Sequence, residues 1–147
     1  DPEPATPEVE AELHLTRVER DELLRRSDIV TLHVPLNRST TKMISDAEFD
    51  MMKPTAVLIN ACRGPVVDEA ALVRAIEQKK IMSAGLDVTE VEPTPKDNPL
   101  FAFDNVLITP HLAAFAQEST ERSRVFATAN TTRVANGQDP ESIVLPD

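Results

Sequence analysis

The sequence predicts an α/β domain with a parallel sheet and helices on both faces. Apolar runs rich in β-branched residues alternate with stretches of helical periodicity, in units as long as a strand–helix–strand connection requires. The run AVLIN at 56–60 is almost wholly apolar, which is typical of a central parallel strand buried on both sides. The 147 residues have the size of one ordinary domain.

Composition narrows the range of functions. The formal net charge is −10 and no stripe of Lys and Arg offsets it, which argues against a nucleic-acid partner. No apolar stretch approaches the ~20 residues that span a bilayer, so no membrane association is expected, and the N-terminal residues do not resemble a signal peptide. A single cysteine, Cys62, excludes an internal disulfide and suits the reducing cytoplasm, where we expect the protein to be located.

Three elements are predicted in the first part of the chain. LHLTRV at 13–18 is a candidate short strand, and ERDELLRRS at 19–27 has helical character. DIVTLHV at 28–34 is rich in β-branched residues and is bounded by Pro35, which predicts a strand.

Two helices flank the central strand at 56–60. Ser45 followed by Glu48 forms a capping box, which predicts a short helix over DAEFDMM that Pro54 ends. DEAALVRAIEQKK at 68–80 gathers its apolar residues on one side, with acids first and lysines last, and this charge order complements the helix dipole.

The last part of the chain repeats the alternation. Strands are predicted at 82–88 and 105–109, separated by a Pro-rich loop at 89–104. A final helix is predicted over roughly 117–136, ending at Gly137.

Four polar residues follow the predicted strands: Arg63, Asp87, Glu92 and His111. The carboxyl ends of parallel strands share one edge, where ligands bind in open α/β sheets. A cation, carboxylates and an imidazole at such an edge suit proton transfer to a carbonyl with a neighbouring anion. Taken singly, each has a structural explanation, such as a surface ion pair, a turn cap or a solvated charge. Their joint placement is what favours a functional site.

The three glycines bear on the type of α/β domain. A dinucleotide-binding fold normally opens with a strand, a GxGxxG loop and a helix. Gly64, Gly85 and Gly137 are too far apart to form that loop. Either the domain is of another kind, or the first half of such a fold is missing from the chain.

Four segments resemble, in order and spacing, the C-terminal half of the D-isomer-specific 2-hydroxyacid dehydrogenases: SDIVTLHVPLNRSTTKMI, MMKPTAVLINACRGPVVDEAAL, AGLDVTEVEP and NVLITPHLAA. The phosphoglycerate dehydrogenase branch looks nearest. The resemblance implies an incomplete Rossmann-type domain over 1–116, lacking its first strand, glycine loop and first helix. Residues 117–147 would form a terminal helix and tail returning toward an absent substrate domain. We therefore expect a fragment of a longer enzyme.

The resemblance implies catalytic roles for three residues. Arg63, in the N-A-x-R-G motif, would hold the substrate carboxylate and carbonyl oxygen, which suits a bidentate guanidinium. His111, in the T-P-H motif, would give a proton to the carbonyl oxygen as hydride arrives, or remove it in the reverse direction. Glu92 would orient His111.

The resemblance also implies NAD as the cofactor, with no metal. Asp87 would bind the nicotinamide carboxamide, and the nicotinamide side would be lined by Ala61, Cys62 and Ala114, the last at a position where the family often has glycine. Asp1 would accept the adenosine ribose hydroxyls. No Arg or Lys follows within residues 2–8 to accept a 2′-phosphate, so NAD is favoured over NADP. The positions near the adenosine half are His33, Pro35 and Thr40.

These residues support an oxidoreductase that transfers a hydride between NAD and a D-2-hydroxy acid or 2-keto acid, with phosphoglycerate dehydrogenase as the model and the isolated chain expected to be inactive. A glyoxylate or hydroxypyruvate reductase is the alternative within the enzyme class. Two alternatives lie outside the enzyme class. One is a non-catalytic, NAD-responsive binding or corepressor-like module, and the other is a fragment with no function of its own. The resemblance further implies a homodimer of the full-length protein.

Overall fold

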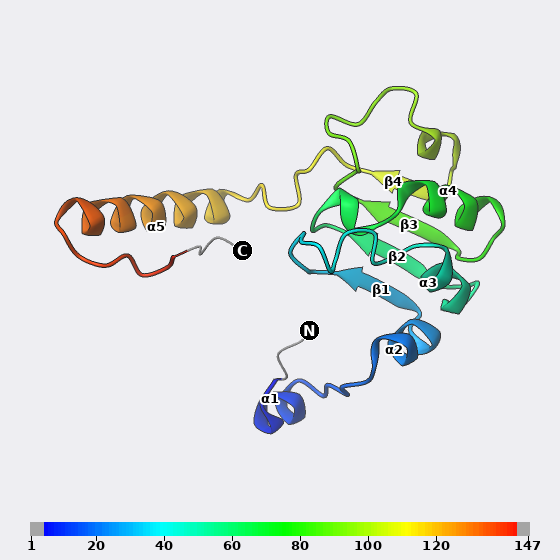
Figure 1. Cartoon of the computed structure of the whole chain (residues 1–147), viewed down its shortest axis with the longest axis horizontal. Coiled ribbons are helices and arrows are strands. Elements are labelled where there is room, and N and C mark those ends of the chain that lie inside the picture. The colour runs from blue at the N-terminus through cyan, green and yellow to red at the C-terminus, as the bar shows by residue number, and fades with distance from the viewer. Residues whose placement is uncertain (1–4, 144–147) are drawn as a thin grey trace. The chain divides into compact units, whose positions relative to one another are not determined.

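The computed structural model describes residues 5–143, which form two compact units, one ending at His111 and one beginning at Leu112. The first unit contains one parallel sheet with the strand order β1-β2-β3-β4 (Figure 1). The strand bounds are Ile29–Leu32 for β1, Val57–Asn60 for β2, Ser83–Leu86 for β3 and Val106–Ile108 for β4. The predicted parallel α/β sheet is confirmed.

The strands are paired so that their carboxyl ends lie in one row. Leu32 pairs with Asn60, Asn60 with Leu86, and Leu86 with Ile108. The ladder continues for one residue beyond the strands, since the N–H of Asp87 donates to the carbonyl of Asn60 at 2.9 Å. The residues that follow the four strands therefore begin at the same edge.

Three helices of this unit share one core with the sheet. They are α2 (Arg20–Arg26), α3 (Asp46–Met51) and α4 (Glu69–Glu77). Their buried residues, including Leu24, Phe49 and Leu72, pack with alternate residues of the strands such as Leu58 and Leu86. Burying these apolar side chains supplies most of the folding free energy of the unit.

No helix among the described residues of the first unit covers the opposite face of the sheet. Ile29 is 61% exposed and Leu107 is 68% exposed, and both belong to that face. Coverage by helices on both faces was expected from the apolar run of β2, but the helices of the first unit cover one face. An apolar strand pattern shows what a strand can bury, whereas the covering element has to come from elsewhere in the fold.

The predicted capping box of Ser45 and Glu48 is present, and α4, predicted over 68–80, has a cap of its own. Ser45 is the N-cap of α3, and its N–H donates to Glu48 Oε2 at 3.0 Å. Asp68 is the N-cap of α4, where its Oδ1 accepts the N–H of Ala71 at 3.1 Å. These bonds satisfy N–H groups that have no partner within the helix. Lys79, just beyond α4, has a φ of 56°, a left-handed conformation that stops the helix.

The segment 13–18 is not a strand, so that prediction is wrong. It is irregular and lies between α2 and a short helix, α1 (Pro7–Glu12), which the sequence analysis did not predict. LHLTRV has the composition of a strand, but no neighbouring strand pairs with it, and Leu13 and Leu15 remain exposed. Thr6 caps α1 with its hydroxyl, and Pro7 occupies the first helical position.

The second unit contains α5 (Gln117–Ala135), close to the predicted 117–136.

Two short 3-10 helices belong to the first unit, η1 (Gly64–Val66) and η2 (Pro99–Ala102). Within residues 5–143, no helix combines the length and the apolar character that crossing a membrane requires.

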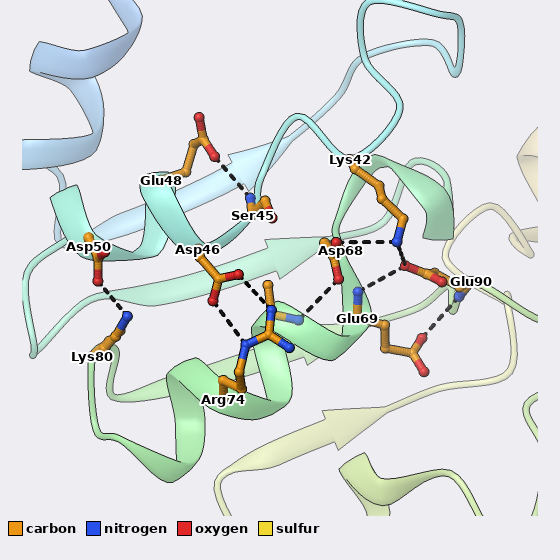
Figure 2. A network of polar contacts seen from close by, with 11 residues as sticks. Lys42, Ser45, Asp46, Glu48, Asp50, Asp68, Glu69, Arg74, Lys80 and Glu90 are labelled. Carbon is orange, nitrogen blue, oxygen red and sulfur yellow. Dashed lines mark hydrogen bonds and ion pairs between the residues drawn. The ribbon is translucent and has the colours of Figure 1, made fainter.

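Ion pairs link neighbouring helices at the surface of the first unit, as Figure 2 shows. Arg74 of α4 binds Asp46 of α3 through two nitrogens, at 2.6 and 3.0 Å, and Lys80 binds Asp50 at 2.5 Å. The Arg74 guanidinium lowers the pKa of the Asp46 carboxyl below its ordinary value. These side chains are solvated, so the pairs fix the relative orientation of the helices more than they add stability.

At Gly64, the loop after β2 lies directly against the backbone of the loop after β3. A Cβ at this position would lie 1.9 Å from the carbonyl oxygen of Thr89 and 2.1 Å from its carbon. Because backbone atoms cannot move aside as a side-chain tip can, Gly64→Ala is expected to destabilise the full-length protein by about 1–3 kcal/mol or more. Urea unfolding measures the loss.

Gly85→Ala is the matched control, because a Cβ there meets nothing within 4 Å. It is expected to leave stability nearly unchanged. Equal losses in the two variants would show that the Gly64–Thr89 approach is not the cause.

Asp68 predicts a dependence of stability on pH. The N–H of Ala71, followed by the Lys42 ammonium, lowers the pKa of Asp68 below its ordinary value of 3.8. The carboxylate therefore stabilises the fold fully above pH 3.8, and this contribution disappears as the pH falls through the folded-state pKa. Asp68→Asn keeps a capping oxygen but removes the charge, so its melting temperature should differ from wild type at pH 6 and converge with it at acid pH.

Thermal melts from pH 7 to pH 2 test this expectation, with Asp104→Asn as the control for loss of one negative charge at an exposed site. A difference between Asp68→Asn and wild type that stays constant over the whole range would contradict it.

Candidate active site

The candidate residues lie along the edge formed by the carboxyl ends of the strands. His33, Ala61, Asp87 and Thr109 each come directly after the paired row, at the ends of β1, β2, β3 and β4 respectively. The expectation that this edge collects the polar residues therefore agrees with the structure.

His111 and Glu92 form a hydrogen-bonded pair at this edge. His111 Nδ1 lies 2.9 Å from Glu92 Oε2, and the side chains are 47% and 39% exposed. The other carboxylate oxygen, Oε1, accepts the N–H of Thr89 at 3.3 Å, which fixes the direction of the carboxylate. Because Nδ1 faces Glu92, Nε2 is the ring nitrogen available to exchange a proton with a substrate.

His111 has an uncommon backbone conformation. Its φ is 56°, in the left-handed region that residues other than glycine rarely adopt. Its N–H donates to the carbonyl of Asp87 at 2.8 Å and also reaches that of Thr109 at 3.0 Å. These contacts hold the strained residue in place and tie its imidazole to the end of β3, a kind of constraint that often occurs at functional sites.

Asn60 organises the turn that presents Arg63. Its side chain is almost completely buried; Nδ2 donates to the carbonyl of Arg63 at 3.0 Å, and Oδ1 accepts the N–H of Cys62 at 3.1 Å. The Cys62 thiol lies 3.1 Å from the same oxygen. The sequence analysis did not single out Asn60. The sequence did contain a signal for it, because Asn60 is a polar residue at a position that belongs to the buried face of an otherwise apolar strand.

Arg63 is exposed at this turn. Its Nη1 donates to the carbonyl of Cys62 at 2.6 Å, and within residues 5–143 it forms no ion pair. The guanidinium therefore has donors that can bind an anion bidentately.

Asp87 and Thr109 connect the ends of β3 and β4. Asp87 is buried, and its Oδ1 accepts the hydroxyl of Thr109 at 2.5 Å. The sequence analysis likewise did not select Thr109 as a site residue, although Thr109 is the threonine of the T-P-H motif.

The end of β1 forms a separate part of the edge. His33 Nε2 lies 2.9 Å from the hydroxyl of Thr31. Thr40 donates its hydroxyl to the carbonyl of Pro35 at 2.6 Å and accepts the N–H of Asn37 at 2.9 Å. These bonds close the loop after β1. Because β1 and β4 are the outer strands, the structure separates His33, Pro35 and Thr40 from the pair of Glu92 and His111.

Two predicted cofactor residues lie outside the part of the first unit that the structure describes. Ala114 is part of the second unit, which begins at Leu112. Asp1 lies outside the described residues. Ala61 is exposed directly after β2, so its backbone can be reached by a ligand at the edge.

A pocket of about 640 Å³ lies beside the histidine–glutamate pair. Glu92 and His111 line it together with apolar residues that include Pro93, Phe101 and Ile108. A volume of this size accommodates a small organic acid next to the imidazole. Within residues 5–143, no group of three or more His, Cys, Asp or Glu side chains is placed to hold a metal ion.

The role of Asn60 can be tested by its removal. Asn60→Ala deletes the three contacts that fix the turn at 61–63 and leaves the part-buried Cys62 N–H and Arg63 carbonyl without these partners, so a loss of about 2–3 kcal/mol is expected in urea unfolding. Asn105→Ala removes one exposed bond, to the carbonyl of Met82, and serves as the control. A loss from Asn60→Ala no larger than that from Asn105→Ala would contradict the structural role.

Comparison with known proteins agrees with the motifs. The family model described as D-isomer specific 2-hydroxyacid dehydrogenase, NAD binding domain, matches residues 1–113. The glyoxylate reductase of Thermofilum pendens is 45% identical over 124 residues, covering 84% of this chain and 37% of the relative. The D-3-phosphoglycerate dehydrogenase of Archaeoglobus fulgidus is 42% identical over 120 residues, covering 82% of this chain and 23% of the relative. The chain thus spans less than half the length of these relatives.

Solved structures show the same relationship. D-lactate dehydrogenase with NAD+ from Lactobacillus jensenii aligns with a TM-score of 0.83 at 38% identity, over 97% of this chain and 46% of that one. The holo form of D-mandelate dehydrogenase from Rhodotorula graminis aligns with a TM-score of 0.89 at 34% identity, over 100% of this chain and 44% of that one. Since the family model matches residues 1–113 of 147, and the fold and the predicted motifs agree with it, this chain belongs to the D-isomer specific 2-hydroxyacid dehydrogenase family through its NAD-binding domain.

Proposed function

We propose that this chain supplies the substrate-anchoring and proton-transfer residues of an NAD-dependent D-2-hydroxyacid dehydrogenase. The observation that carries the proposal is the bond between His111 Nδ1 and Glu92 Oε2, at the same sheet edge as the exposed Arg63. An acid–base group and an anion-binding group at one edge are what reduction of a 2-keto acid requires.

The chemistry of the donor set fits the nicotinamide end of the cofactor. A carboxamide can donate to the Asp87 carboxylate, and the exposed backbone at Ala61 and Cys62 offers further polar groups at the same edge. Bound NAD would supply the transfer of a hydride to or from the carbon that bears the reacting oxygen. The remaining chemistry falls to this chain.

In the direction of reduction, Arg63 binds the carboxylate and the adjacent keto oxygen of the substrate. Its positive charge stabilises the negative charge that develops on that oxygen as hydride reaches the carbon. His111 then donates the Nε2 proton to the oxygen, so the carbonyl gains one hydride and one proton and becomes a hydroxyl. Glu92 stabilises the imidazolium before the transfer and keeps the proton of Nδ1 in place afterwards. Oxidation of the hydroxy acid follows the same steps in reverse.

The edge recognises the part of the substrate that the candidates share. Glyoxylate and the keto acid of a phosphoglycerate dehydrogenase both carry a carboxylate next to a carbonyl, and one guanidinium matches that pair of groups. Among the described residues, those that line the pocket include no Lys or Arg. A phosphate on the substrate would therefore need a cation from outside this pocket.

We also propose a cytoplasmic homodimer for the full-length protein. The single, free Cys62 suits a reducing compartment, and dimerisation follows from the resemblance to the family. Light scattering combined with size-exclusion chromatography tests the oligomeric state, and a monomer at micromolar concentration would contradict it.

The function is tested by the absorbance of reduced NAD in the full-length protein, with glyoxylate, hydroxypyruvate and phosphohydroxypyruvate as substrates. Wild type is expected to turn over at least one of them. His111→Ala should lower kcat by roughly 10²–10⁴-fold, because it removes the proton donor. Arg63→Lys should lower kcat/KM on the order of 10²-fold, because it removes the bidentate contact to the developing charge.

His14→Ala is the control, since His14 is an exposed histidine in the segment between α1 and α2 and belongs to none of the loops that follow the strands. Normal turnover by His111→Ala would refute the assigned mechanism. Tight binding of NAD with no turnover of any of the three keto acids would favour a non-catalytic binding module.

A further inference from the structure

The loop between β3 and η2 carries half of the proton-transfer pair but has no helix or strand of its own. Residues 89–98 are irregular, and Glu92 lies within them. Glu92 Oε2 bonds to His111, and Glu92 Oε1 accepts the N–H of Thr89 in the same loop. The position of the carboxylate relative to the imidazole therefore depends on what holds this loop against the domain.

Glu69 connects both ends of this loop. Its Oε2 accepts the N–H of Glu90 at 3.0 Å, and its Oε1 accepts Nδ2 of Asn98 at 2.6 Å. Glu90 returns the contact, because its Oε1 accepts the N–H of Glu69 at 2.9 Å. Figure 2 shows the reciprocal pair, with each carboxylate directed at the backbone of the other residue.

The end of the loop is itself fixed through Asn98. This side chain is buried, and its Oδ1 accepts the N–H of Leu100, which caps η2. Leu100 is fully buried in the core. The Glu69–Asn98 bond therefore ties the loop to a point that cannot move without disturbing the core.

Glu69 is a firm anchor because it is the first residue of α4. Asp68 caps this helix, and Leu72, Ala75 and Ile76 bury its inner side. Lys42 lies 3.2 Å from Asp68 and 3.6 Å from Glu90, which offsets repulsion among the neighbouring acids. Both oxygens of Glu69 accept hydrogen bonds from neutral donors, so the residue acts as a bridge and not as a partner in an ion pair.

We propose that Glu69 is a positioning residue for proton transfer: it holds the loop 89–98 on α4, and through Glu92 it sets the orientation of His111. None of the hydrogen bonds of the described residues joins Glu69 to Arg63, Glu92 or His111 directly, so its effect passes through the loop. The proposal rests on the proposed function for its kinetic consequence but not for its structural one.

The kinetic test is a double-mutant cycle in the full-length protein. Glu69→Ala is expected to lower kcat for the best 2-keto acid by about 10- to 100-fold, because small displacements of a catalytic group have effects of this size. The KM for the keto acid should change by less than about threefold, since Arg63 belongs to another turn. In a Glu92→Gln background, the same change should alter kcat by less than about twofold, because the effect passes through Glu92. An undiminished effect in that background would overturn the proposal.

Glu77→Ala is the matched control, an exposed glutamate at the other end of α4, and it should leave kcat unchanged. Glu69→Gln provides a second variant of native size. It keeps one acceptor but turns an NH₂ group toward a donor, so it should show an intermediate fall in kcat with the same dependence on Glu92. If Glu69→Ala does not fold, the cycle is completed with Glu69→Gln, and additivity in that cycle would overturn the proposal equally.

The structural test uses no catalysis. The chain contains three histidines, so the imidazole ¹⁵N signals of ¹⁵N-histidine-labelled protein can be assigned with His14→Ala and His111→Ala. Glu69→Ala should move the His111 signals toward those of Glu92→Gln and speed amide exchange over 89–98. Unchanged His111 signals would overturn the proposal. Changed signals in a protein that turns over none of the keto acids would support the positioning and reject the dehydrogenase function.

Discussion

The in-register ends of the parallel strands are the constraint on which the site depends. The last residues of the four strands lie in one row: Leu32, Asn60, Leu86 and Ile108. The loop that follows each strand therefore starts at the same edge of the sheet. Hydrogen bonds extend this row past the strands, from Asp87 to Asn60 and from Thr109 to Leu86. A slip of one residue in any strand would turn its side chains to the other face and move its loop along the strand direction. The pairing that buries the apolar core therefore also places the loops that carry Arg63 and His111 at the same sheet edge.

The connection after β2 determines the shape of the connection after β3. Gly64 lets the first loop pass against the carbonyl of Thr89, and Glu69 then binds the backbone of Glu90. The two contacts act on the same loop from neighbouring points of one short segment, 64–69. Position 64 requires glycine for a steric reason, because a side chain there would collide with the backbone of Thr89. The segment that directly follows Arg63 therefore also sets where Glu92 can lie.

The elements that the sequence predicted correctly depend on local order, whereas the missed features depend on contacts between distant residues. Apolar runs and caps placed β1–β4, α3 and α4 near their observed bounds, because propensity, capping and burial pattern act over a few residues. LHLTRV has a strand composition but lacks a pairing partner, which composition cannot reveal. The motif resemblance identified Arg63 and the Glu92–His111 pair, and the structure brings the pair together. Glu69 was not identified, because its partner Asn98 is 29 residues away and its value appears only when the loop is folded.

The solvent exposure of His111 and Glu92 limits the strength of their electrostatic interactions. His111 and Glu92 are between a third and a half exposed, so solvent screens both their mutual attraction and the charge of a bound carboxylate. The same groups act more strongly once water is excluded, because hydrogen bonds and charges strengthen as the surrounding dielectric constant falls. A substrate that fills the pocket removes part of this water, and the apolar lining residues Pro93, Phe101 and Ile108 disfavour the return of solvent. The pairing of Glu92 with His111 before substrate arrives then matters most, since a carboxylate already in place needs no reorganisation when the proton is transferred.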